Sequence, residues 1–386
     1  MKKLLLAILT LFSFVGSAQQ NKAYFQQKVD YAIAVTLDDR NNSLEGNISI
    51  AYTNNSPDTL REIYMHLWPN AYKDRNSAMA CQHLVNRDIK FHYADDEERG
   101  FIDKIDFKIN GQTIPWKFDS EHKDIALISL EAPLLPGDTT NISTPFFVKI
   151  PSGKFSRLGH IGQSYQITQW YPKPAVYDRA GWHPMPYLTQ GEFYSEFGKF
   201  DVQITAPENY LIAATGDLQT ASEISFLKDA AAKGEQLKQK FAKWDKSVQD
   251  VFLQKNDFPE SSEKTKTLHF SQDNVHDFAW FADKRFHVLK TPIKLFNGKQ
   301  ITGWAFFTNG NANLWFDAPK YLERSTQFYS ERVGVYPYNV VTAVDGTISA
   351  GGGMEYPTIT VIGRTRTAKE LDRVITHEVG HNWFYG

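Results

Sequence analysis

The chain has 386 residues, a formal net charge of −2 and 42% hydrophobic residues. A chain of this length can bury large cores, and we expect about two or three domains. Because the charge is nearly balanced and no basic block is present, nucleic acid is not an expected partner. Cys81 is the only cysteine, which excludes disulfides within the chain and a metal site built from several thiolates. It is expected to be a small buried apolar residue.

Residues 1–18 have the composition of a secretory signal peptide. Lys2 and Lys3 precede an apolar stretch that continues to Val15, and the small residues from Gly16 to Ala18 offer a cleavage site. The apolar stretch is shorter than a bilayer requires, and no cysteine follows it to carry a lipid. We therefore expect export, to the periplasm or the extracellular space, without a stable membrane anchor. A retained N-terminal anchor is the alternative.

Residues 19–288 are expected to form an N-terminal β domain. From residue 24 to about residue 218, apolar and polar residues alternate, with turn residues between the runs, which is typical of strands with one buried face. We predict a large antiparallel β domain of sandwich or saddle type. The clearest strands are expected at 29–37, 46–52, 63–67, 125–130, 146–150 and 200–204.

The alternation is interrupted at about 222–256. Polar residues dominate there, and apolar residues recur at helical spacing, at Leu237, Phe241, Trp244, Val248 and Val251. This spacing predicts one amphipathic helix, inserted into a connection between two strands.

A second domain is expected over residues 289–386, where predicted strands and helices alternate. Strands are expected at 301–307, 340–344 and 358–362, and a helix at 312–333. Pro319 lies inside that helical span and either kinks the helix or marks its true start. The predicted fold class is therefore α+β with more than one domain.

The most specific motif closes the chain, as His377-Glu378-Val379-Gly380-His381. On a helix, positions i and i+4 share one face, so both imidazoles can bind one metal ion. The adjacent Glu378 can act as general base on a metal-bound water. The alternative is a surface helix that carries two polar histidines without a metal.

The helix that carries this motif is predicted over Ala368–Tyr385. Thr367 and Glu370 have the spacing of a capping box at its start. The span contains no proline, and Gly380 is its only weak helix former.

A glycine-rich segment precedes the predicted strand at 358–362. Gly351 to Gly353 are followed by Met354 and Glu355. Glycines let a peptide approach the backbone as an added edge strand, and a carboxylate at the end of such a strip can bind a free α-amino group. Taken alone, this loop is better interpreted as an ordinary turn. Its place upstream of the histidine motif favours peptide binding.

The two motifs together resemble the aminopeptidase-N family of zinc metallopeptidases, the gluzincins. The resemblance rests on Gly352-Gly353-Met354-Glu355 followed by His-Glu-Val-Gly-His-Asn-Trp-Phe at 377–384. Tyr336-Pro337-Tyr338 is similar to a Tyr-Pro segment of the family, and Gln169 lies in a stretch similar to the Gln loop of its β domain. The resemblance implies an N-terminal β domain followed by the start of a thermolysin-like α/β zinc catalytic domain.

The resemblance also implies roles at the metal. His377 and His381 would bind one zinc ion, and Glu378 would be the general base. The implied activity is zinc-dependent hydrolysis of peptides from the N-terminus.

Further implied roles concern the substrate, a peptide with a free N-terminus. Glu355 would bind its α-amino group, with Gln169 contributing. Gly352, Gly353 and Met354 would line the bound peptide strand.

Two features depart from the family's pattern. Tyr356 stands where the family usually has Asn, which changes the expected contacts to the substrate backbone. The family's third zinc ligand, a Glu, and its oxyanion-stabilising Tyr would fall beyond Gly386. We therefore expect the N-terminal part of a longer enzyme, with little activity as it stands.

Two other functions remain open. A non-catalytic peptide-binding or scaffold protein of the same fold is disfavoured by the intact motif, because such a protein does not need Glu378. An endopeptidase is disfavoured by Glu355, because a buried carboxylate would block a substrate that continues past its N-terminus.

Overall fold

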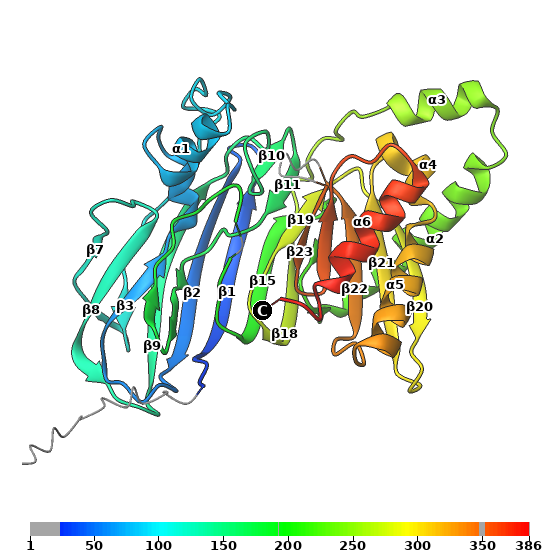
Figure 1. Cartoon of the computed structure of the whole chain (residues 1–386). Helices are drawn as coiled ribbons and strands as arrows, with labels where there is room; N and C mark the ends of the chain where they lie inside the picture. The colour runs from blue at the N-terminus through cyan, green and yellow to red at the C-terminus, as the bar shows by residue number, and fades with distance from the viewer. Residues whose placement is uncertain (1–23, 192, 347–351, 386) are drawn as a thin grey trace, which may run out of the picture.

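The computed structural model describes residues 24–191, 193–346 and 352–385, so the predicted signal peptide lies outside the described residues. In this part of the chain, strands gather at the N-terminal side and strands mixed with helices at the C-terminal side (Figure 1). No helix of the described ranges is long and apolar enough to cross a bilayer.

The largest sheet runs through the middle of the β region in the order β17-β18-β15-β1-β2-β9-β5-β6, with β4 also paired to β9. Alternate apolar side chains of its central strands are buried, as the alternation predicts. β1 and β15 are parallel, so the prediction of a purely antiparallel domain is wrong. The chain returns to β1 only after a long crossover, which allows the two strands to run the same way. The strands are β1 (Lys28–Asp38), β2 (Ser43–Thr53), β4 (Phe101–Asp103), β5 (Lys108–Ile109), β6 (Gln112–Thr113), β9 (Thr139–Lys149), β15 (Gly198–Pro207), β17 (Asp217–Leu218) and β18 (Thr265–Val275).

Three smaller sheets complete the β region, in the orders β12-β3-β8-β7, β10-β11-β19-β16 and β13-β14. Their strands are β3 (Leu60–His66), β7 (Trp116–Phe118), β8 (Ile125–Leu134), β10 (Gly159–Ile161), β11 (Ser164–Ile167), β12 (Lys173–Pro174), β13 (Val176–Asp178), β14 (Gly181–His183), β16 (Leu211–Ala214) and β19 (Trp280–Asp283). A 3₁₀ helix, η1 (Trp68–Tyr72), and helix α1 (Ala78–Val85) follow β3.

Cys81 lies on α1 and is exposed, so the prediction that it is buried is wrong. The helix turns Met79, Ala80 and His83 inward. At helical spacing, position 81 then points to the solvent.

The predicted insertion is present between β17 and β18, but it forms two helices, α2 (Ala221–Phe241) and α3 (Lys246–Gln254). Phe252 of α3 folds back against Phe241 and Trp244, with ring centroids 5.9 and 5.5 Å away. A continuous helix would carry these rings apart. The prediction of one helix with a single buried face is therefore wrong, and Val251 is 71% exposed.

The C-terminal sheet has the order β20-β21-β22-β24-β23, and its inner strands β21, β22 and β24 are parallel. Helices α5 and α6 lie against one face (Figure 1), while α2 packs on β20 from the other side. Pro319 lies in the first turn of α5, so it marks the true start of that helix. The elements are β20 (His287–Lys294), β21 (Gln300–Phe307), η2 (Asn309–Asn311), α4 (Ala312–Trp315), α5 (Ala318–Arg332), β22 (Val340–Asp345), β23 (Gly353–Tyr356), β24 (Ile359–Ile362) and α6 (Ala368–Gly380).

The two regions share a buried core, because side chains from both pack together behind β23. This core includes Ala213, Phe281, Phe306, Met354, Tyr356 and Val361. Strand β23 is therefore one of the elements through which the C-terminal sheet meets the β region.

Candidate metal and peptide site

Helix α6 begins as the sequence predicts. The Thr367 hydroxyl accepts a hydrogen bond from the Glu370 backbone N–H at 3.1 Å, and the Glu370 carboxylate accepts one from the Arg366 N–H at 2.8 Å. The first bond satisfies an N–H group that the first turn leaves without a helical partner, and the second ties the residue before the N-cap to the helix. Such a cap fixes where the helix starts, and therefore which residues face the sheet.

The helix ends at Gly380, so the prediction that it continues to Tyr385 is wrong. The next residues form tighter turns, in which Trp383 N–H donates to the carbonyl of Gly380. Tertiary contacts draw this segment away from the helix axis. Asn382 Oδ1 accepts from the Thr358 N–H at 3.0 Å, and Trp383 Nε1 donates to the carbonyl of Gly334 at 2.6 Å.

The two motif histidines nevertheless share one face. Their ring centroids are 5.0 Å apart, and the ligand atoms of His377, Glu378 and His381 all lie within 4.8 Å of one another. Two ligands of one zinc ion, each at about 2.1 Å, can be up to about 4.2 Å apart. Imidazole nitrogens are donors that zinc takes, so His377 and His381 fit a zinc ion after a small side-chain adjustment, with the Glu378 carboxylate beside it.

Strand β23 lies directly against this motif. A Cβ atom at Gly353 would lie 2.5 Å from the Oε1 of Glu378, a distance that real Cβ contacts do not show. Glycine at this position therefore allows the strand to approach the helix. Gly352 is exposed, and Gly351 lies outside the described residues.

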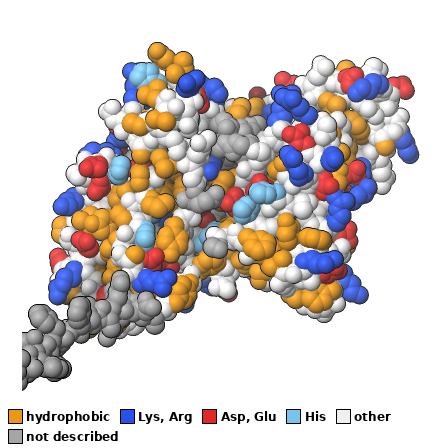
Figure 2. All heavy atoms as spheres, in the orientation of Figure 1, with side chains coloured by type: hydrophobic (Ala, Val, Ile, Leu, Met, Phe, Trp, Pro, Cys, Tyr) orange, Lys and Arg blue, Asp and Glu red, His pale blue; other side chains and the backbone are white. Residues whose placement is uncertain are grey.

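Glu355 points from β23 toward the second histidine. Its Oε1 lies 4.0 Å from His381 Nδ1, and its side chain is 13% exposed. Figure 2 shows histidine and acidic side chains together on the surface over α6, near the middle of the face. The strand thus brings a carboxylate beside the histidine motif.

A small cavity of about 40 Å³ lies next to Glu355. It joins residues of the glycine strip to residues of the β region. Its walls are Gln169, Phe193, Ser195, His276, Asp277, Met354, Glu355, Tyr356 and Tyr385. The structure therefore brings Glu355, Met354 and Gln169 together, although they are far apart in the sequence.

Gln169 is buried and its carboxamide has partners at both ends. Its Nε2 donates to Asp277 Oδ2 at 3.3 Å, and its Oε1 accepts from the Tyr356 hydroxyl at 3.3 Å. Tyr356, the residue that departs from the family's Asn, is buried and directed into the β region.

Several residues of this cavity were not singled out from the sequence. Asp277 forms a buried ion pair with Lys173, whose Nζ lies 3.1 Å from Asp277 Oδ2. Burial lowers the pKa of His276 to about 4, so this imidazole is neutral at neutral pH. The available signal was the pair of titratable residues 276–277 within an aromatic-rich apolar stretch.

Met354 is held by the β region as well. Arg157, which is buried, places its Nε 3.0 Å from the Met354 sulfur and donates from its other nitrogens to the carbonyls of Leu188 and Gly191. The sequence offers no sign of this contact, because Arg157 lies in an unremarkable loop. Met354 and Tyr356, which alternate with Glu355 along β23, thus both contact the β region.

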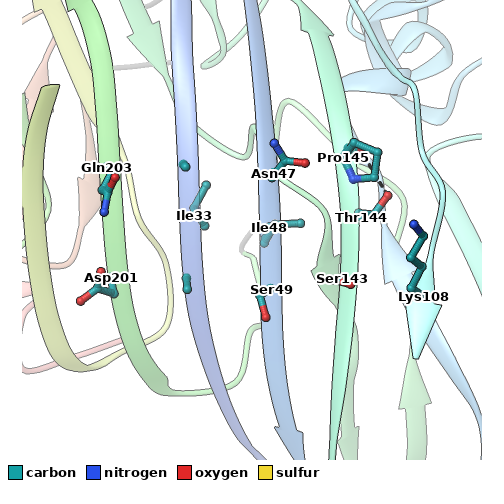
Figure 3. A pocket seen from close by; sticks show the side chains of 12 residues that line it. Ile33, Asn47, Ile48, Ser49, Lys108, Ser143, Thr144, Pro145, Asp201 and Gln203 are labelled. Atoms are coloured by element: carbon teal, nitrogen blue, oxygen red, sulfur yellow. Dashed lines mark hydrogen bonds between the residues drawn. The ribbon is translucent and has the colours of Figure 1, made fainter. Parts of the chain in front are cut away.

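A larger depression of about 440 Å³ lies elsewhere, on the outer face of the nine-stranded sheet (Figure 3). It is shallow, and its walls combine apolar residues such as Ile33 and Ile48 with polar ones such as Asn47, Asp201 and Gln203. None of the candidate metal or amine ligands lies there, so we assign it no part in the site.

Solved structures provide the comparison with known proteins. An M1 zinc metallopeptidase from Deinococcus radiodurans, solved as a mutant, matches with a TM-score of 0.54 at 14% identity, over 93% of this chain and 65% of that chain. The fold is therefore similar to that of M1 zinc metallopeptidases. This bears out the predicted resemblance at the level of the fold.

Two further structures have a similar fold at 14% identity, again over 93% of this chain and 65% of theirs. One is a two-domain M1 zinc metallopeptidase mutant bound to L-arginine, with a TM-score of 0.53. The other is the Deinococcus radiodurans mutant bound to a Tyr-Ser-Ala substrate, with a TM-score of 0.52. The chain thus spans about 65% of the length of these structures. Models of known protein families and curated protein sequences give no match.

Proposed function

We propose that the chain belongs to an exported zinc aminopeptidase that hydrolyses N-terminal residues of peptides. The observation that carries the proposal is the convergence of His377, Glu378 and His381 with Glu355, in a fold similar to that of M1 zinc metallopeptidases. The metal donors lie at the C-terminal end of α6, with His381 as its C-cap, and the amine-binding carboxylate lies on β23. A peptide between the two elements would meet both.

His377 and His381 would hold the zinc ion, which lowers the pKa of a bound water and polarises the scissile carbonyl. Glu378 lies next to these ligands, and its carboxylate is buried against Gly353. It would accept the proton of the attacking water and deliver it to the leaving amine. Glu355 would pair with the peptide's α-ammonium group and so fix which peptide bond reaches the histidines.

The size of the cavity beside Glu355 supports an aminopeptidase over an endopeptidase. A volume of about 40 Å³ holds an ammonium group and one or two water-sized groups, since a water needs about 10–15 Å³ by the same measure. A further residue of a longer peptide would not fit.

A non-catalytic peptide-binding protein is the second candidate. It would use Glu355 and the glycine strip in the same way and would need no proton acceptor beside the histidines. The enzyme is favoured, because the Glu378 carboxylate lies beside both histidines, where a proton acceptor is needed only for catalysis.

The experiment uses the zinc-loaded protein extended beyond Gly386 by the residues expected to supply the third zinc ligand, and compares it with its Glu378→Gln variant. We expect hydrolysis of leucyl-4-nitroanilide to fall by about 10²–10⁴-fold in the variant, with zinc content unchanged. N-acetyl-leucyl-4-nitroanilide should not be cleaved by either protein. Cleavage of the blocked substrate would support an endopeptidase, and zinc and amine binding without any turnover would support the non-catalytic protein.

A further inference from the structure

The backbone of Gln169 has an unfavourable conformation, which contacts with other residues must stabilise. Its φ is +48°, a left-handed conformation that residues other than glycine rarely adopt. The next two residues provide the support, because Trp170 Nε1 donates to the Phe278 carbonyl at 3.0 Å and the Tyr171 hydroxyl donates to Asp277 Oδ1 at 2.7 Å. These two hydrogen bonds therefore anchor the loop that carries Gln169 to the buried residues Asp277 and Phe278.

The orientation of the Gln169 carboxamide is fixed by chemistry. A carboxylate only accepts hydrogen bonds, so Asp277 Oδ2 must face the Gln169 NH₂ group. The oxygen then lies on the opposite side, where the Tyr356 hydroxyl donates to it. Burial raises the pKa of Tyr356 above its ordinary value, so the hydroxyl keeps its proton and stays a donor.

Asp277 is equipped to remain ionised. Burial by itself would raise its pKa, but Lys173, the Tyr171 hydroxyl and the Phe278 N–H together hold the pKa below its ordinary value. Lys173 is buried too, and it also donates to Ser195 Oγ at 3.2 Å. The acceptor that orients Gln169 is thus itself held in place by three donors.

We infer that Tyr356 and Asp277 are positioning residues, which hold the Gln169 carboxamide so that its oxygen faces the amine cavity. This inference rests on the proposed function. An amide oxygen has two lone pairs, and Tyr356 uses one, which leaves the other for the substrate's ammonium group. Tyr356 stands at the position where the family usually has Asn. It therefore affects amine binding indirectly, by orienting the Gln169 carboxamide.

Tyr356→Phe is the sharpest test, because it removes the hydroxyl and keeps the ring. Without this donor the carboxamide loses one of its two fixed ends, and we expect affinity for a free-amine ligand to fall about tenfold. Tyr210→Phe is the matched control. It likewise removes a hydroxyl that donates a buried hydrogen bond, in this case to the Asp39 carboxylate, at 2.8 Å from Oδ2 and outside the amine cavity.

The measurement is calorimetric binding of L-leucinamide and of N-acetyl-L-leucinamide to the zinc-loaded full chain. The ratio of the two affinities reports amine recognition, because a general loosening of the fold would weaken both ligands alike. We expect Tyr356→Phe to lower this ratio about tenfold and Tyr210→Phe to leave it unchanged.

The outcomes separate the inference from the proposed function. A wild-type chain that binds both ligands equally, or neither, overturns the proposed function and the inference with it. A wild-type chain that prefers the free amine, with the same preference in Tyr356→Phe, overturns the inference alone. An equal loss of preference in Tyr210→Phe would also overturn it, since the effect would then be one of general stability.

Discussion

Gly353 and Glu378 lie so close that the strand carries no side chain where the helix presents its carboxylate. A Cβ atom at position 353 would lie 2.5 Å from Glu378 Oε1. The glycine strip is proposed to leave space for a bound peptide, and the same glycine also makes room for the proposed general base. This contact therefore lets the strand that presents Glu355 lie close to the helix that presents Glu378.

Gly353→Ala should displace either Glu378 or β23. We expect the free energy of unfolding to fall by about 1–3 kcal/mol, as for other additions of a methyl group to a tightly packed position. Urea unfolding checks this. The neighbouring Gly352→Ala is the control, because its Cβ would lie 3.7 Å from Val374 Cγ2, an ordinary contact. A similar loss in both variants would show that the contact with Glu378 is not the cause.

Glu355→Gln should change which ligands bind without releasing zinc. The variant keeps the size of the side chain and removes the negative charge that would pair with an ammonium group. We expect the preference for leucyl over N-acetyl-leucyl substrates to fall by at least about tenfold. Zinc content, measured by atomic absorption, should stay the same. If Glu355→Gln keeps the full preference, another group recognises the amine.

The features of the fold that could be predicted depend on local sequence patterns. The buried face of β1 follows from alternation within the strand, and the start of α6 follows from the capping box at Thr367 and Glu370. These signals depend on residues within a few positions of one another. The same holds for Pro319, whose missing N–H suits the first turn of α5.

The features that could not be predicted depend on contacts between residues far apart in the sequence. The break between α2 and α3 depends on Phe252 folding back onto Phe241. No glycine or proline at 242–245 marks the break in the sequence. The partners of Gln169 come from positions 277 and 356, so only the folded chain shows that Tyr356 faces the β region. Which of a helix's residues face solvent, as for Cys81, likewise depends on what the helix packs against.

Zinc should bind through Nε2 of His381. The Nδ1 atom of this ring lies 3.4 Å from the Phe384 carbonyl oxygen and 4.0 Å from Glu355 Oε1, so the opposite nitrogen faces the metal position. We expect His381→Ala to lower zinc affinity by at least about tenfold, measured by competition with a chromophoric chelator. His92→Ala, at a half-buried position outside the site, should have no effect. Undiminished affinity in His381→Ala would rule out the proposed metal site.

Glu196 should make the protein less stable as the pH rises. Burial raises its pKa to about 8 in the folded chain, from an ordinary value of 4.5. Between these values the folded carboxyl keeps a proton that the unfolded chain has released, so the folded state binds more protons and a rise in pH favours unfolding. The stabilising contribution is fully present below about pH 4.5 and is lost as the pH rises toward 8.

Glu196→Gln removes this titration while keeping the size of the side chain. From pH 5 to pH 7.5 we expect the free energy of unfolding of the wild type, relative to Glu196→Gln, to decrease by about 3 kcal/mol, since one pKa unit corresponds to about 1.4 kcal/mol. Urea unfolding at several pH values gives this difference. Subtracting the variant cancels the titrations of the other buried groups. One of these is His276, whose lowered pKa makes the free energy of unfolding rise with pH.

Glu131→Gln, at an exposed position, is the control, and its free energy of unfolding should change with pH in the same way as that of the wild type. If the difference between wild type and Glu196→Gln stays constant over this range, the Glu196 carboxyl is not held in its protonated form by the fold.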